Sequence, residues 1–217
     1  MKEQSRMINS ILSSCFFINF NGMKEKPKIL AFAGSTRVGS YNKMILKYAV
    51  EGAKRAGAEI TLIDLKDYPM PLYDGDLEKE HGIPENGKKL FNMMLEHHGL
   101  LIASPEYNSG ISGVLKNSLD WASRPVPNMK PLAAFDNKVA GLISASPGAL
   151  GGLRGLAALR YVLGNIKVLV LPEQVAVPKV NEMIDDKGVM KDEKKQQTLE
   201  NLGKHLTEVI AKLMVKS

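Results

Sequence analysis

The sequence predicts a single α/β domain in which an open, five-stranded parallel sheet is covered by helices on both faces. Three observations lead to this prediction: short apolar runs alternate with helical segments, the runs are continuously apolar, and polar turns separate them. Continuous apolar runs are typical of strands buried on both faces, as in parallel sheets. Strands that alternate with helices indicate an α/β architecture with right-handed crossovers.

The strands are expected where the apolar runs lie, and the first two runs read KILAFA and EITLIDL. The predicted strands span residues 28–33, 59–65, 99–104, 138–144 and 167–172. In open parallel sheets, ligands bind beyond the carboxyl ends of the strands, close to the point where the strand order reverses. A functional site is therefore expected in the loops that follow the first, third and fourth strands.

Each strand is followed by a predicted helix. Ser40 is a good N-cap for the first helix, which ends near Gly57, and Pro84 opens the second, which ends near residue 97. The third helix spans residues 112–124, the fourth follows Gly152, and the last spans about residues 192–213. Apolar residues recur at spacings of three and four in these helices, which gives each of them one buried face.

Two connecting segments are expected to be irregular. Residues 66–84 contain three prolines and two glycines, which interrupt regular structure. Residues 125–136 are also rich in proline and are interpreted as a loop.

The charge balance argues against nucleic-acid binding. The chain of 217 residues is 44% apolar and carries a net charge of +6, which can attract small anions. Its basic residues are spread out, and the densest run, Lys191 to Lys195, contains two acidic residues. Such a run is typical of a solvated helix start. We therefore expect small-molecule partners and no nucleic acid.

Cysteine, histidine and hydropathy patterns exclude further classes of function. The chain has a single cysteine, Cys15, so neither an intramolecular disulfide nor a cysteine metal cluster is expected. The histidines lack metal-binding spacing, and His97 and His98, at a predicted helix end, are interpreted as surface polar groups. Because no apolar stretch reaches about 18 residues, no membrane span is expected.

Residues 1–22 differ from the rest of the chain. They place Lys2 and Arg6 before an apolar patch, residues 8–20, in a pattern that weakly resembles a secretory signal. Polar residues interrupt the patch, however, and a second methionine follows it. The segment is interpreted as a disordered extension or the product of an upstream start, and residues 23–217 as the single domain.

The first loop, GSTRVGSYNK at residues 34–43, joins a strand to a helix N-terminus, where free N–H groups and the helix dipole favour anions. It lacks the middle glycine of a dinucleotide-binding fingerprint and the lysine of an ATP-binding P-loop, so an ATPase is not expected. Its hydroxyl and amide groups, together with Arg37, suit a monophosphate anchor such as that of FMN. The alternative is a plain capped turn with a surface arginine.

The other two loops have compositions that suit contact with a flat ring. In SPEYNSG, Tyr107 offers an aromatic wall, and Asn108 and Gly110 tolerate positive φ. In SASPGALGG, the glycines let the backbone approach a ligand closely at a helix N-terminus, where negative charge is favoured. Ordinary strand-to-helix turns are the alternative for both loops.

Together, GSTRVGSYNK, SPEYNSGISGVLKNSLDW and SASPGALGG resemble the motifs of the NAD(P)H-dependent FMN reductase family, which includes quinone, chromate and azo-dye reductases. The resemblance covers about residues 25–215, and its most specific part is P-E-Y-N followed by L-K-N-x-x-D-W. It implies a flavodoxin-like, three-layer α/β/α fold with the strand order 2-1-3-4-5.

The resemblance also implies which residues bind the cofactor. The phosphate ligands fall on Ser35, Arg37, Ser40 and Asn42, with Tyr41 nearby; the loop that contacts the ring falls on Pro105, Glu106, Tyr107 and Asn108; the third loop falls on Ser144, Ser146 and Gly148. Lys116, Asn117, Asp120 and Trp121 match the helix that follows and are interpreted as structural or interface residues. Glu106 could be considered as an acid, but shaping its loop is the preferred interpretation.

The implied activity is hydride transfer from NADPH or NADH to bound FMN and then to an acceptor such as a quinone, free flavin, azo compound or metal oxyanion. The chemistry belongs to the cofactor, so no catalytic side chain and no metal are required. The resemblance further implies a homodimer or homotetramer in which a neighbour completes the site. A cytoplasmic location is expected.

Two other classes of function remain open on the residues alone. The first is a non-enzymatic, flavodoxin-like electron carrier, which the net positive charge disfavours because such carriers are usually acidic. The second is a nucleotide-binding regulator that uses the same phosphate loop without turnover. Steady NADPH oxidation separates the enzyme from the carrier, and flavin absorbance separates it from the regulator.

Overall fold

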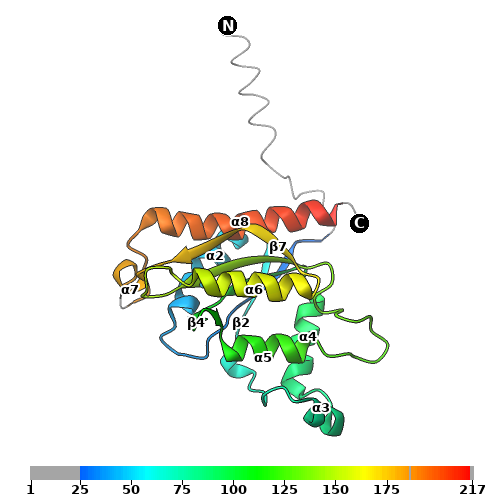
Figure 1. Cartoon of the computed structure of the whole chain (residues 1–217). Helices are drawn as coiled ribbons and strands as arrows, with labels where there is room; N and C mark the ends of the chain where they lie inside the picture. Colours follow the sequence, from blue (N-terminus) through cyan, green and yellow to red (C-terminus); the bar gives the residue numbers. More distant parts are fainter. Residues whose placement is uncertain (1–24, 186, 216–217) are drawn as a thin grey trace.

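The computed structural model describes residues 25–185 and 187–215 (Figure 1). The predicted extension, residues 1–22, lies outside the described residues. The long strands are β1 (Lys28–Ala33), β2 (Glu59–Asp64), β3 (Gly99–Ala103), β6 (Val139–Ala145) and β7 (Leu169–Val177). The long helices are α2 (Tyr41–Arg55), α4 (Glu85–Glu96), α5 (Gly113–Ala122), α6 (Leu153–Asn165) and α8 (Glu193–Met214). Shorter elements are η2 (Leu65–Asp67), α3 (Gly75–His81), β4 (Glu106–Tyr107), β5 (Gly110–Ile111) and α7 (Val180–Met183).

The five long strands form one parallel sheet in the order β2-β1-β3-β6-β7. If the long strands alone are counted along the chain, this order is the predicted 2-1-3-4-5. The order reverses between β1 and β3, so the loops that follow these two strands lie beside each other at the carboxyl edge. The three-layer α/β/α prediction is confirmed.

Helices cover both faces of the sheet and create two hydrophobic cores (Figure 1). On one face, α2 and α8 pack against the sheet, with buried residues such as Ile45 and Leu206. On the other face, α4, α5 and α6 bury residues such as Leu90, Leu119 and Leu159. Strands β1, β3 and β6 are almost wholly buried between the two layers, as their continuous apolar runs predict.

Two glycines let α2 and α8 cross at very short range. A Cβ atom added to Gly52 would lie 1.9 Å from the carbonyl oxygen of Glu200, and one added to Gly203 would lie 1.8 Å from that of Ala49. No side chain fits at either position, so the helix backbones meet directly. Among the residues that the structure describes, no helix is both long and apolar enough to cross a membrane.

The prediction that residues 66–84 lack regular structure is wrong. The segment contains η2 and the helix α3, whose N-cap Asp74 accepts hydrogen bonds from the backbone N–H groups of Asp76 and Leu77. The three prolines lie outside α3, so they do not interrupt it. An aspartate cap is sufficient to start a helix of two turns between them.

The fifth strand is longer than predicted, because β7 continues through Pro172 to Val177. β7 pairs only with β6 and therefore lies at the edge of the sheet, where a proline that lacks an N–H group is tolerated. The register between the two strands shifts around this proline: Ala140 pairs with Val170, whereas Leu142 pairs with Gln174. The extra residues form a bulge on the edge strand.

The interpretation of His97 as a surface group is also wrong. Its side chain is buried, and its ring nitrogens lie 2.5 Å from the carbonyl oxygen of Met93 and 2.7 Å from Oγ1 of Thr61. It closes the C-terminal end of α4 against β2. His98 is half-buried, and its Nδ1 accepts a hydrogen bond from the backbone N–H of Lys28.

Candidate active site

Three loops meet at the carboxyl edge of the sheet. They follow β1, β3 and β6, which are neighbours in the sheet, so segments far apart in sequence lie side by side. Two hydrogen bonds extend the sheet pairing into the loops: the N–H of Gly34 donates to Ala103, and that of Ser104 donates to Ile143. The structure therefore brings together all three loops in which the sequence predicts site residues.

The first loop presents the N-terminus of α2 to solvent. Ser40 caps the helix by accepting a long, 3.5 Å hydrogen bond from the N–H of Lys43, and the first turn contains no acidic residue. Arg37 and Gly39 are exposed, and a Cβ atom added to Gly39 would have no neighbour within 4 Å. Ser35 is buried and accepts from the N–H of Arg37. Open space, an exposed cation and a positive helix end together fit an anionic group such as a phosphate.

Asn42 ties the first loop to the end of β6. Its Nδ2 donates to the carbonyl oxygen of Ala145, and its Oδ1 accepts from the N–H of Ala145, both at 3.0 Å. The side chain is buried, although Nδ2 retains a second N–H for a ligand. A direct contact between Asn42 and a phosphate therefore remains a prediction. In the structure, the amide joins the first loop to the end of β6.

The second loop is a small hairpin rather than a simple turn. β4 and β5 pair antiparallel, and the two residues between them, Asn108 and Ser109, have φ angles of 51° and 66°. Positive φ at both central residues is typical of the tight turns that join two strands. Of the two residues expected to tolerate positive φ, Asn108 adopts it and Gly110 does not, because Ser109 takes that conformation. Tyr107 projects from the hairpin and is 52% exposed.

Glu106 joins the hairpin to α6. Its Oε2 accepts from the N–H of Gly155 at 2.9 Å, and its Oε1 accepts from Nε and Nη2 of Arg154 at 3.0 and 2.9 Å. The N-cap residue of α6, Gly152, has no side chain to supply such a bond. The N–H of Gly155 is the main reason that the pKa of Glu106 lies below its ordinary value, and Arg154 adds to the effect. Glu106 therefore remains an anion. It caps α6 directly, although it belongs to a different segment of the chain, and this agrees with the interpretation that it shapes its loop.

The third loop passes close to the second. Gly152 has a φ angle of 88°, and a Cβ atom there would lie 1.9 Å from Oγ of Ser144. The Ser144 hydroxyl is buried and donates to the carbonyl oxygen of Ser104 at 2.6 Å. Ser146 accepts from the N–H of Gly148 at 3.1 Å, which curls the start of the loop. Close packing thus requires a glycine at position 152, whereas Gly148 has room for a Cβ atom.

The predicted site residues fall into two groups. Those with exposed side chains or backbone at the loop surface are Arg37, Tyr107, Asn108 and Gly148, with Tyr41 and Ser146 half-buried. Those that brace the loops are Ser35, Ser40, Asn42, Pro105, Glu106 and Ser144, of which all but the half-buried Glu106 are buried.

Sequence reasoning missed Ser112 and Arg154 as parts of the site. Ser112 caps α5 and donates to the carbonyl oxygen of Gly34 at 2.6 Å, which fastens the first loop to the second. Its position before a helical run was a cap signal, but nothing local indicated its partner. Arg154 contacts Glu106 across 48 positions of sequence, and no local pattern identifies such a pair.

The residues of α5 that follow the hairpin have structural duties, as predicted. Nε1 of Trp121 and Nδ2 of Asn117 both donate to the carbonyl oxygen of Pro71, at 2.8 and 2.9 Å. Lys116 and Asp120 form an ion pair along the helix. The two hydrogen bonds to Pro71 attach the segment that contains α3 to α5.

Comparison with known proteins gives consistent matches. The family model for NADPH-dependent FMN reductases matches residues 27–182. An NAD(P)H-dependent FMN reductase of Pseudomonas aeruginosa is 34% identical over 179 residues, which cover 82% of this chain and 92% of that protein. A quinone reductase of Escherichia coli is 33% identical over 187 residues, with 85% and 94% covered. The solved structure of FerB, a flavoenzyme NAD(P)H:(acceptor) oxidoreductase of Paracoccus denitrificans, superposes with a TM-score of 0.70 at 26% identity, with 86% and 98% covered.

Proposed function

The chain belongs to the NADPH-dependent FMN reductase family, and on that premise we propose that it is an FMN-binding, NAD(P)H-dependent oxidoreductase. The family resemblance predicted from the loop motifs is confirmed. The observation that carries the proposal is the first loop, where an exposed arginine and an open helix N-terminus lie beside two braced loops. This arrangement fits a cofactor with a phosphate at one end and a flat ring at the other.

The first loop supplies the phosphate anchor. Backbone N–H groups at the start of α2 and the exposed guanidinium of Arg37 bind the phosphate oxygens, because anions are stabilised at helix N-termini and by charged donors. Ser35 and Ser40 hold the loop open through their hydrogen bonds to its backbone. The absence of acidic residues from the first turn of α2 leaves this positive end without a competing charge.

The second and third loops orient the ring. Glu106 fixes the hairpin on α6, so the exposed Tyr107 and Asn108 would contact the ring, and Ser146 and Gly148 of the third loop would border it. FMN, when bound, would supply two-electron chemistry, with NAD(P)H as the hydride donor and a second substrate as the electron acceptor. Because the loops are cross-linked by hydrogen bonds, the ring meets a pre-formed surface, and little ordering accompanies binding.

We propose quinones as the first acceptors to test, because relatives of this chain include a quinone reductase and a 2-hydroxy-1,4-benzoquinone reductase. Both substrates use the same pocket in turn, so ping-pong kinetics are expected. We place the activity in the cytoplasm, where NAD(P)H is available.

The experiment has two stages. The purified chain is titrated with FMN, and flavin fluorescence is followed to obtain a Kd; NADPH and NADH oxidation is then measured with a quinone. Saturable FMN binding with steady turnover supports the proposal. Binding of FMN without turnover would identify an electron carrier, and a chain that binds no flavin would be a regulator or another protein altogether.

A matched pair of variants tests the anchor. Arg37→Ala should weaken FMN binding by roughly 10- to 100-fold, the effect of one charged hydrogen bond. Lys47→Ala removes an equally exposed cation from α2 outside the loop and should leave the Kd unchanged. Equal FMN affinity in both variants would reject the assignment of the first loop.

We also propose that the chain forms a homodimer or homotetramer. Val38 in the first loop is 86% exposed, and Leu150 in the third loop and Leu153 and Tyr161 on α6 are exposed as well. Apolar surface next to a site is typical of a subunit interface. Sedimentation of the wild-type chain and of Tyr161→Arg tests this, and a wild-type monomer at all concentrations contradicts it.

A further inference from the structure

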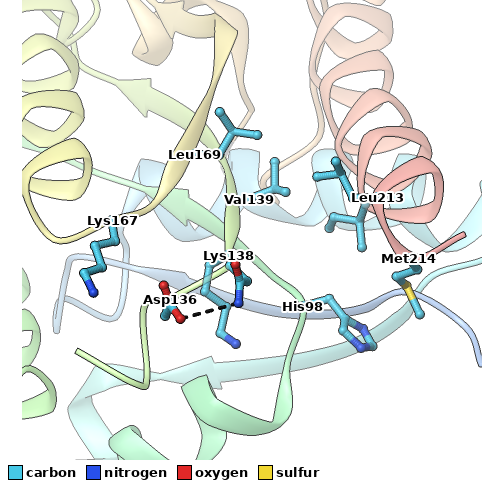
Figure 2. Close-up of a pocket in the computed structure, with 10 residues that line it drawn as sticks. His98, Asp136, Lys138, Val139, Lys167, Leu169, Leu213 and Met214 are labelled. Carbon is cyan, nitrogen blue, oxygen red and sulfur yellow. Dashed lines mark hydrogen bonds between the residues drawn. The ribbon is translucent and has the colours of Figure 1, made fainter. Parts of the chain in front are cut away.

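A hollow lies at the opposite edge of the sheet, where the strands begin (Figure 2). It has a volume of about 530 Å³, which is within the range of about 300–1,000 Å³ that is usual for small-molecule sites. It lies at the amino ends of β3, β6 and β7 and is covered by the end of α8. Its lining residues are His98, Asp136, Asn137, Lys138, Val139, Lys167, Leu169, Ile210, Leu213 and Met214.

Lys138 is the unusual member of this lining. Its residue surface is only 7% exposed, but no fully buried side-chain nitrogen of residues 25–185 and 187–215 lacks a hydrogen-bond partner, so the ammonium group, for which no hydrogen bond or ion pair is found there, reaches the open space of the hollow. Burial lowers the pKa of Lys138, although the nearby Asp136 opposes the shift. The largely buried stem leaves this ammonium group partly desolvated, and a nearby anion offsets the cost of that desolvation. The structure therefore contains a cation that a bound anion would stabilise.

The acid at this edge does not neutralise the lysines around it. Asp136 forms an ion pair with Lys130, which is the main reason that the pKa of this carboxyl lies below its ordinary value. Lys138 and Lys167 also act on Asp136. Three lysines thus act on one carboxylate, and two of them, Lys138 and Lys167, line the hollow.

His98 adds a neutral donor. Its Nδ1 accepts the backbone N–H of Lys28, and burial lowers the pKa of the ring. The neutral ring consequently carries its proton on Nε2, where it can donate to an acceptor. Figure 2 shows Lys138 and Lys167 toward one side of the hollow and Leu213 and Met214 on the other.

We propose that this hollow binds a small amphipathic carboxylate. The carboxylate pairs with Lys138 and Lys167, and the hydrocarbon body lies against Val139, Ile210 and Met214. The lining has a cationic side and an apolar side, and an amphipathic carboxylate suits both. An inorganic anion would leave the apolar side uncovered. A purely apolar molecule would leave Lys138 without an anionic partner.

The site is separate from the candidate active site and does not depend on the proposed function. Val139 lines the hollow at one end of β6, whereas Ala145 contacts the first loop at the other end. A strand of this length, seven residues, spans roughly 20 Å. A ligand in the hollow can therefore bind while the carboxyl edge is occupied.

The test is isothermal titration of the whole chain with sodium octanoate, in the absence and in the presence of FMN, with acetate and 1-octanol as probes that lack the tail and the charge respectively. Saturable binding of octanoate, at least tenfold tighter than that of either probe, is expected. Lys138→Met and Lys167→Met should each weaken octanoate binding by roughly tenfold, the effect of losing a charged hydrogen bond. Lys212→Met removes an exposed charge from α8 outside the hollow and should bind octanoate as the wild type does.

Thermal unfolding of each variant shows whether it is still folded. Lys138→Arg keeps the positive charge, so its Kd for octanoate should stay within a few-fold of the wild-type value. Several outcomes would overturn the proposal: no saturable binding, equal binding of octanoate and 1-octanol, equal binding by Lys138→Met and the wild type, or displacement of octanoate by FMN.

Discussion

Replacement of Glu106 tests the idea that a distant carboxylate caps α6 and holds two loops together. In Glu106→Ala, the N–H of Gly155 loses its acceptor, which costs about 1 kcal/mol by analogy with N-cap deletions. The lost interaction between the anion and the helix end adds about 0.3–1 kcal/mol. The ion pair with Arg154 adds at most about 1 kcal/mol, because the arginine side chain is 61% exposed.

The expected loss is therefore about 2 kcal/mol of unfolding free energy, which lowers the Tm of a chain of this size by roughly 4–8 °C. Glu106→Gln keeps a neutral acceptor and should lose about 1 kcal/mol. Urea and thermal unfolding, followed by circular dichroism, measure both variants. Glu173→Ala removes an exposed acid from β7 and should change stability by no more than about 0.5 kcal/mol.

The pH dependence gives a second check on the same bond. Because the folded pKa of Glu106 is lowered, the carboxylate stabilises the fold above the ordinary glutamate pKa, and this stabilisation is lost as the pH falls through the lowered value. The stability difference between wild type and Glu106→Gln should be constant near neutral pH and shrink in acid. A difference that is below about 0.5 kcal/mol at neutral pH, or that grows in acid, would refute the reasoning.

Three further predictions concern the same loops. Asn42→Ala leaves two buried backbone groups at the end of β6 without partners, so urea unfolding should show a loss of about 2–4 kcal/mol. Gly152→Ala places a methyl group in occupied space at positive φ and should lower the Tm strongly, whereas Gly39→Ala meets open space and should unfold like the wild type. Trp121→Phe loses the hydrogen bond to Pro71, and hydrogen exchange should speed up in the segment containing α3, with a stability loss of about 1 kcal/mol.

The strands could be predicted because an apolar run in the sequence marks each of them. The apolar runs that become β1, β3 and β6 are buried on both faces, and the turn residues around them leave no other assignment. β7 was predicted too short because Pro172 usually ends a strand, and only the position of β7 at the sheet edge makes that proline acceptable. α3 was missed because the prolines and glycines around it outweighed one aspartate cap.

The location of the candidate site was also predictable, since the loops after three neighbouring strands of a parallel sheet must meet at one edge. The contacts of individual side chains were harder to predict. Asn42 was predicted as a phosphate ligand, yet its amide is engaged by Ala145, which is 103 positions away in sequence. The same holds for Glu106 and Gly155, because a polar side chain reveals its residue type but not its distant partner.

The close packing of α2 against α8 at Gly52 and Gly203 affects how the protein folds during its synthesis. Helix α8 is the final element of the described chain, and it covers, with α2, one whole face of the sheet. Until α8 has left the ribosome, the part of this face that α8 covers stays exposed to solvent, because α2 covers only the rest. During that interval, chaperones or wrong partners can bind the exposed apolar residues.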